Sequence, residues 1–267
     1  MGYIIYNNEL DSTVTTDVTV SSGSIVDDTS ESKLLTRALA DKYEFTKTGL
    51  GSLTITLTLT GTISKNSLSI LGLESSGLVL LDITLYNGVS DQGLTTPDPI
   101  FKSRYVDGVY VLDEHYIFDN YFTFDKVEIR YADVSGGSGA FQKLYCGTAV
   151  EIDFQPIGAN YAPSDTSQKD YSNGRQAYVN TGVMYNNLKI SAKGLTHSQA
   201  WNAGGISIND INLVAGTDQP LILIPNTSEN ISVYGTQKTL ATLTPELKND
   251  GVTEWYWKAS LNIEEEL

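Results

Sequence analysis

The residues with the greatest chemical potential lie in the segment "YVDGVYVLDEHYIFDNYFTFD", which begins at position 105. Five carboxylates alternate there with tyrosines and phenylalanines. Paired carboxylates supply the acid and base of glycosidases, and Asp107, Asp113, Glu114, Asp119 and Asp125 are candidates for such a pair. We select as candidate interaction residues Tyr105, Tyr110, Asp113, Glu114, Tyr116, Phe118 and Tyr121.

Three functions are compatible with this segment. The first is a loop whose aromatic side chains pack on a sheet or on a neighbouring subunit, and it is the function that we favour because Tyr and Phe are common in interface cores. The second is a sugar-binding groove, and the third is a catalytic pair. Calcium binding has no support from EF-hand-like spacing.

Signatures of catalysis and of metal binding are otherwise sparse. The two histidines, His115 and His197, are far apart in sequence, and there is no H-E-x-x-H, C-x-x-C, G-x-S-x-G or phosphate-binding loop. A Ser-His-Asp triad stays open, because its members meet in space and not in sequence. We predict a protein that is not an enzyme, with no cofactor and no metal. Cys146, in an apolar run, is interpreted as a buried structural thiol.

The composition predicts a folded, acidic chain. Its 267 residues are enough for one large β-domain or two smaller ones, and the formal net charge is −15. Nucleic acid would be repelled by this surface, whereas a basic partner would be attracted. We expect no signal peptide and no membrane insertion, because no apolar run is long enough to span a bilayer.

Alternation with period two is the clearest structural signal. In "SLTITLTLTGTISKNSLSILGL", from position 52, Leu53, Ile55, Leu57 and Leu59 alternate with threonines, which predicts a strand with one buried face. Gly61 and "SKN" are predicted turns. A short helix is expected in "SESKLLTRALADKYEF", residues 30–45, with an irregular loop as the alternative.

The rest of the chain divides into further strands and long connections. Residues 88–107 are predicted to form a surface excursion, and "SGGSG" at 135–139 a hairpin turn. The predicted domains are a jelly-roll β-sandwich over residues 1–155, a linker or arm over 156–175, and a smaller β-rich unit over 176–267. Loops as long as the middle segment usually carry a function or are mobile.

The order of these features resembles discoidin-type, galactose-binding-like jelly rolls of virion proteins in tailed bacteriophages. Leu34, Leu35, Thr36 and Arg37 match an N-terminal loop of that family, and Leu71–Leu73 match a turn between strands. "KVEIRYAD" and "KLYCGTAVEIDFQP" resemble its last strands, and "WYWKASLNIEEEL" its second half. The region 88–125 departs from the pattern by being longer and more aromatic, as an inserted subunit contact would be.

The resemblance implies an all-β structural protein of the virion tail tip or baseplate, made in the host cytoplasm. Its expected partners are other tail proteins and further copies of itself, three or six in a ring. The alternative function is a carbohydrate-binding module that contacts host-surface glycans. The fold itself does not decide between these functions.

Overall fold

The computed structural model describes residues 2–10, 15–21, 23–25, 39, 42–47, 52–76, 79–92, 97–106, 109–132, 137–152, 160–165, 167–171, 177–180, 184–201, 207–247 and 255–266. The described chain is almost entirely β-structure, with antiparallel pairing between its strands. The prediction of an all-β fold is therefore confirmed. No described helix is both long and apolar enough to cross a membrane.

A long bent ribbon of two antiparallel strands, β5 (Leu53–Ser76) and β9 (Val109–Tyr131), organises the N-terminal part of the chain. Its register shifts between Thr58 and Ile63 and again near residues 65–67, where the ribbon bends. Each half of the ribbon then pairs with a different set of strands. The neighbours are β2 (Thr15–Ser21) and β6 (Leu80–Asn87) for one half, and β8 (Ile100–Val106), β10 (Ser138–Phe141) and β11 (Lys143–Ile152) for the other.

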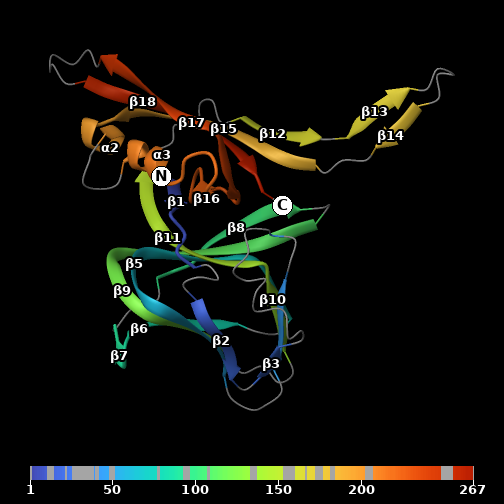
Figure 1. The fold of residues 1–267 in the computed structure, drawn as a ribbon, viewed down its shortest axis with the longest axis vertical. Coiled ribbons are helices and arrows are strands. Elements are labelled where there is room, and N and C mark those ends of the chain that lie inside the picture. The colour runs from blue at the N-terminus through green and yellow to red at the C-terminus, as the bar shows by residue number, and fades with distance from the viewer. Residues whose placement is uncertain are drawn as a thin grey trace.

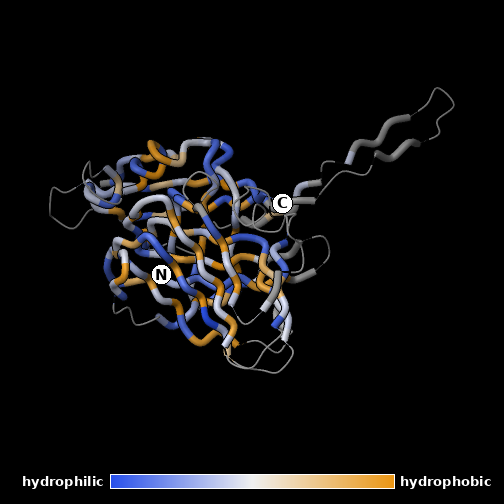
Figure 2. The backbone as a smooth tube through the Cα atoms, turned by 60° about the horizontal axis from the view of Figure 1, so that its bottom comes forward, coloured by the Kyte–Doolittle hydropathy of each residue, from blue (hydrophilic) through white to orange (hydrophobic). Residues whose placement is uncertain are grey.

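The two halves face each other across one core, which makes this part a β-sandwich. Leu53, Ile55, Leu57 and Leu59 are at most 6% exposed, so the predicted buried face is confirmed. They share a cluster with Leu68 and with residues of β9 and β11. Figure 2 shows hydrophobic and hydrophilic positions alternating along the strands of the body. Three short strands complete this part: β3 (Gly23–Ile25), β4 (Tyr43–Lys47) and β7 (Ser90–Asp91).

Several predicted turns and loops are wrong. Gly61, residues 64–66 and Leu71–Leu73 all lie inside β5, since the strand bends and does not reverse. The predicted excursion at 88–107 contains β7 and β8. The strands on either side of the predicted hairpin turn at 135–139 do not pair with each other: among the described residues, β10 pairs with β4 and β5 and not with β9. Most of the predicted helix at 30–45 lies outside the described residues, and its end forms β4.

The C-terminal part continues the same sheet through the N-terminal strand β1 (Gly2–Tyr6). One edge of β1 pairs with β11 and the other with β16 (Leu221–Ile224). The sheet then runs through β17 (Val233–Leu247), β18 (Trp255–Glu265) and β15 (Met184–Leu195). As Figure 1 shows, the helices α2 (His197–Trp201) and α3 (Ile208–Val214) lie together on this sheet. A capping box of Ser207 and Asp210 starts α3.

A two-stranded arm reaches away from this body. β12 (Asn160–Asp165) pairs with the start of β15, and beyond it β13 (Gln168–Tyr171) pairs with β14 (Ala177–Asn180) in a separate sheet. Figure 1 shows β13 and β14 extended beyond the other elements. We call residues 166–183 the arm. The arm overlaps the end of the segment predicted as a linker or arm, residues 156–175, and continues beyond it. The role of that segment stays a prediction.

Candidate functional site

The candidate interaction residues lie on strands and not on a loop. Tyr105 is on β8, and the other six are on β9. Pairing between β8 and β9 aligns Tyr105 with Tyr110 and Lys102 with Asp113. Because successive side chains of a strand point to opposite faces, the set cannot form one continuous surface. Tyr116 and Phe118 belong to the sandwich core, whereas Tyr121 is 45% exposed.

Both carboxylate oxygens of Asp113 accept hydrogen bonds from within the chain. Its side chain is fully buried, and its Oδ1 accepts a hydrogen bond of 2.8 Å from the backbone N–H of Gly72. Its Oδ2 accepts a bond of 3.1 Å from the hydroxyl of Ser232, in the C-terminal part. Gly72 has a positive φ of 66°, and a side chain there would collide with Gln142. Asp113 therefore holds a β5 bulge and joins the two parts of the molecule.

Lys102 makes a second junction beside Asp113. Its ammonium group, on a side chain that is 1% exposed, donates hydrogen bonds to the carbonyls of Asn226 (3.1 Å), Thr227 (2.8 Å) and Glu229. These carbonyls belong to the loop between β16 and β17. Burial lowers the pKa of Lys102, and the charge of Glu229 acts in the opposite direction. Lys102 thus fastens the β16–β17 loop onto β8.

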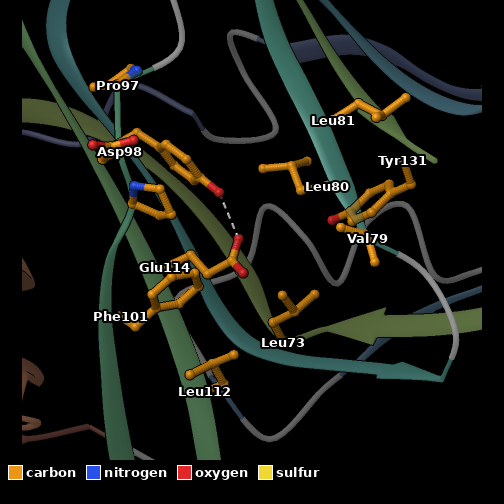
Figure 3. Close-up of a pocket in the computed structure, with 12 residues that line it drawn as sticks. Leu73, Val79, Leu80, Leu81, Pro97, Asp98, Phe101, Leu112, Glu114 and Tyr131 are labelled. Carbon is orange, nitrogen blue, oxygen red and sulfur yellow. Dashed lines mark hydrogen bonds between the residues drawn. The ribbon is translucent and has the colours of Figure 1, made fainter.

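Glu114 faces the opposite way, into a pocket of about 360 Å³ between β6, β8 and β9. Its carboxylate accepts a hydrogen bond of 2.7 Å from the phenol of Tyr116. Burial raises the pKa of Glu114, and the Tyr116 bond opposes this. Figure 3 shows the carboxylate surrounded by apolar side chains. The lining residues are Leu73, Val79, Leu80, Leu81, Pro97, Asp98, Pro99, Phe101, Leu112, Glu114, Tyr116 and Tyr131.

Tyr131 adds a second polar group to this pocket. Its side chain is 1% exposed, and its hydroxyl has no hydrogen-bond partner among the described residues. In Figure 3 the hydroxyl points from the ring toward the pocket interior. Burial raises the pKa of Tyr131, and the nearby charge of Glu114 raises it further. The pocket therefore presents a carboxylate and a phenol within apolar walls.

A smaller and more polar pocket, of about 220 Å³, lies near the base of the arm. It is lined by Ala162, Asn187, Lys189, Lys238 and Asn262. The amide oxygens of Asn187 and Asn262 are buried without a hydrogen-bond partner in the described part of the chain. Two lysines and two asparagines thus line the same small space, and the Lys238 ammonium also pairs with Glu264 at 3.3 Å. Donors and acceptors of these kinds suit a ligand rich in hydroxyls.

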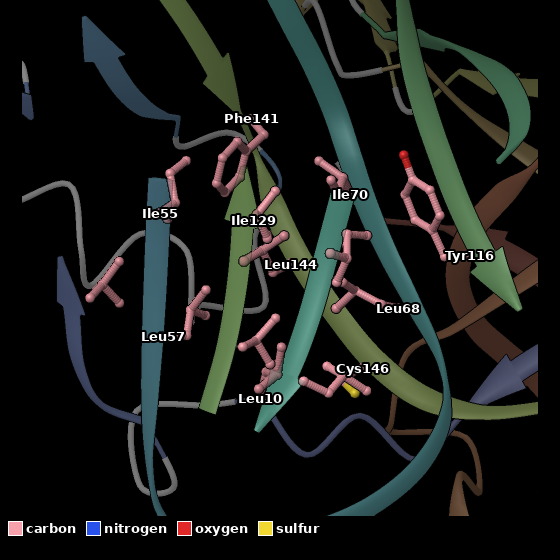
Figure 4. Packing of buried hydrophobic residues seen from close by; sticks show 14 of the residues in the cluster. Leu10, Ile55, Leu57, Leu68, Ile70, Tyr116, Ile129, Phe141, Leu144 and Cys146 are labelled. Atoms are coloured by element: carbon pink, nitrogen blue, oxygen red, sulfur yellow. The ribbon is translucent and has the colours of Figure 1, made fainter. Parts of the chain in front are cut away.

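One serine–histidine contact and the single cysteine in the described part of the chain are closed to a substrate. Ser69 and His115 approach within 2.9 Å, but both are fully buried. Cys146 is 1% exposed, as predicted, and burial raises its pKa to about 12. Figure 4 shows Cys146 in the core beside Leu68 and Leu10. Within the described residues, no three His, Cys, Asp or Glu side chains are placed to hold a metal ion.

Sequence reasoning missed most of the pocket. Glu114 was a candidate, but Phe101, Tyr131 and Val79 were not, because they come from separate segments that only the strand pairing brings together. Lys102 was also missed. A lysine within the apolar pattern of a strand is the one signal that points to it.

No protein-family model matches the chain, and no curated protein matches it. Among solved structures, one similar chain is described as CpGH89CBM32-5 from Clostridium perfringens, in complex with GalNAc-β-1,3-galactose. The TM-score is 0.36 and the sequence identity 16%, over 49% of this chain and 94% of that chain. A score this low does not assign the fold, which rests on the strand pairing itself.

Proposed function

We propose that this chain is a non-catalytic assembly protein that binds a neighbouring protein through its arm. The observation that carries this function is the separate β13–β14 sheet, which extends from the body between the end of β12 and the start of β15. An isolated two-stranded hairpin is marginally stable in water. A second protein packed against the arm would stabilise this hairpin.

The sequence of the arm is suited to such a contact. Residues 166–183 include Tyr171 and Tyr178 on its two strands, which are of a residue type enriched at protein interfaces. The acidic body makes a basic partner favourable. The finer proposal, a bacteriophage tail tip or baseplate containing three or six copies, rests on the resemblance of the sequence to virion proteins.

Replacement of the arm tests this function. Asp165 and Met184 are directly paired, so residues 166–183 can be exchanged for an Asn-Gly turn that closes the β12–β15 hairpin. We expect an unchanged thermal transition of the body and loss of the assemblies that the full chain forms, measured by light scattering and by co-purification with neighbouring gene products. Assemblies that survive the replacement would contradict the proposal.

Carbohydrate binding is the second candidate function, and the polar pocket near the arm favours it. Lys189 and Asn262 are directly paired across β15 and β18, and both line that pocket. Tyr116 cannot be a stacking platform, since it is buried in the core. A glycan array with the native chain and with Asn262→Ala tests this function. Binding that is lost in the variant supports it, and absence of binding by the native chain contradicts it.

A further inference from the structure

The pocket around Glu114 combines apolar walls with two buried polar groups. Its walls are almost entirely aliphatic, aromatic or proline side chains. Among the described residues, the one hydrogen bond to the Glu114 carboxylate comes from Tyr116 and reaches only Oε2. Tyr131 directs into the same space a hydroxyl that has no hydrogen-bond partner among the described residues. A buried polar group without a partner is costly, so a ligand that satisfies both groups would gain affinity.

The mouth of the pocket has the character of a protein interface. Val79, Leu81 and Phe101 are more than half exposed although they are large and apolar. Grouped exposed apolar side chains commonly mark sites of protein contact. Asp98, at the rim, adds a second carboxylate, and the whole chain is strongly acidic. The charge therefore complements a basic partner.

We propose that this pocket binds the side chain of a lysine or arginine presented by a partner protein. The aliphatic stem of the side chain would lie against Leu80, Leu112 and Phe101, and its cationic head would pair with Glu114. Long basic side chains combine an apolar stem with a charged end, which matches the division between the walls and the carboxylate. The pocket volume of about 360 Å³ is within the range of sites for small ligands.

Binding of a basic side chain in this pocket does not involve the arm, which consists of other strands. The side chains lining this pocket come from the N-terminal sandwich, whereas the arm extends from β12 and β15. The arm replacement described above should therefore bind the basic probe as the native chain does. Loss of assembly with retained probe binding would separate the two functions.

Methyl-region NMR of the full chain provides the test, because leucine and valine methyl groups line the pocket. The probes are the N-acetyl, N-methylamide derivatives of lysine, arginine and norleucine. Norleucine has the same type of stem without the charge. We expect the basic probes to shift the pocket methyl signals with a Kd in the millimolar range, and norleucine to bind at least about tenfold more weakly.

Two variants locate the contact. Glu114→Gln removes the charge with little change of shape and should weaken the basic probes about tenfold. Tyr131→Phe removes only the hydroxyl, keeps the ring in the core, and should weaken them several-fold. The matched control is Asp119→Asn, an exposed carboxylate on the same strand, which should bind the probes like the native chain. Thermal unfolding of each variant confirms that it is folded.

Three results would overturn the proposal. One is norleucine binding as tightly as lysine and arginine. Another is unchanged binding of the basic probes by both Glu114→Gln and Tyr131→Phe. The third is a shift of the same methyl signals by a neutral disaccharide when the basic probes have no effect.

Discussion

At the residue scale, the surroundings of each ionisable group decide what it does. Asp113 and Glu114 are adjacent in sequence, yet the first joins the two parts of the molecule and the second faces a pocket. This division follows from the alternation of side chains along β9. Adjacent carboxylates on a strand therefore do not form the close pair that glycoside hydrolysis requires.

Glu114→Gln is expected to change how stability depends on pH. Burial raises the pKa of Glu114 in the folded protein, so the folded chain holds this proton more tightly than the unfolded chain. The contribution to stability is complete below the unfolded carboxyl pKa and is lost as pH rises through the folded value. Above it, the Gln variant should be more stable than the native chain.

Urea unfolding at about pH 4 and about pH 8 measures this difference. Asp119→Asn is the control, because it makes the same change from carboxylate to amide at an exposed position of β9. An advantage of Glu114→Gln that is equal at both pH values would contradict the raised pKa.

The thiol of Cys146 is expected to be inert in the folded chain. Burial raises its pKa to about 12, and it packs among core side chains. Since the thiolate is the reactive form, a thiol reagent at about pH 8 should label Cys146 only after the chain unfolds. Labelling is followed by mass spectrometry with and without denaturant, and rapid labelling of the native chain would show that the core opens.

At the element scale, strands predicted from local alternation are confirmed, whereas their ends are not. Leu53 to Leu59 carry a period-two pattern that any half-buried strand would show. Gly61 and residues 64–66 are typical of turns, yet β5 continues through them because β9, far away in sequence, pairs on both sides of the bend. The pocket was missed for the same reason. Phe101, Glu114 and Tyr131 become neighbours only after β6, β8 and β9 have paired.

Gly235 is expected to be essential for the pairing of β17. It lies opposite Leu221 of β16 and Glu265 of β18, so both edges of β17 are occupied there. An added Cβ would collide with the carbonyl oxygen of Glu264, which belongs to the backbone and cannot rotate away. Gly235→Ala should therefore destabilise the fold by about 1–3 kcal/mol. Denaturant unfolding measures the loss.

Gly61→Ala is the matched control for Gly235→Ala. Gly61 is also within a strand, but nothing in the described part of the chain lies within 4 Å of an added Cβ. The substitution should be neutral or slightly stabilising, because it reduces the freedom of the unfolded chain. Equal effects of the two substitutions would mean that the close contact at Gly235 is relieved without cost.

At the scale of the whole molecule, the two predicted domains share one sheet. β1, the first strand, separates β11 of the sandwich from β16 of the C-terminal part. Ile5 packs in a cluster with Leu71 and Tyr145 on one side of the junction and with Ile222 and Tyr234 on the other. Such continuity predicts that the body unfolds in one cooperative step.

The contact of Lys102 with the β16–β17 loop should contribute measurably to this cooperativity. Lys102→Met keeps the apolar stem but leaves the carbonyls of Asn226, Thr227 and Glu229 without their donor. These three hydrogen bonds are only partly buried, so water can reach some of the freed carbonyls, and a net loss of about 1–3 kcal/mol is expected. Differential scanning calorimetry should show a lower Tm and a C-terminal part that unfolds before the sandwich.

Lys126→Met is the control for Lys102→Met, because it removes a positive charge from the sandwich without affecting the β16–β17 loop. Lys126 also lies in the sandwich, but its side chain is 30% exposed and its ammonium pairs with Glu128 near the surface. Such pairs contribute at most about 1 kcal/mol. The control should keep one transition close to the native Tm. If Lys102→Met also keeps the native transition, the junction is held by β1 and its apolar neighbours, and the lysine only fills space between the two parts.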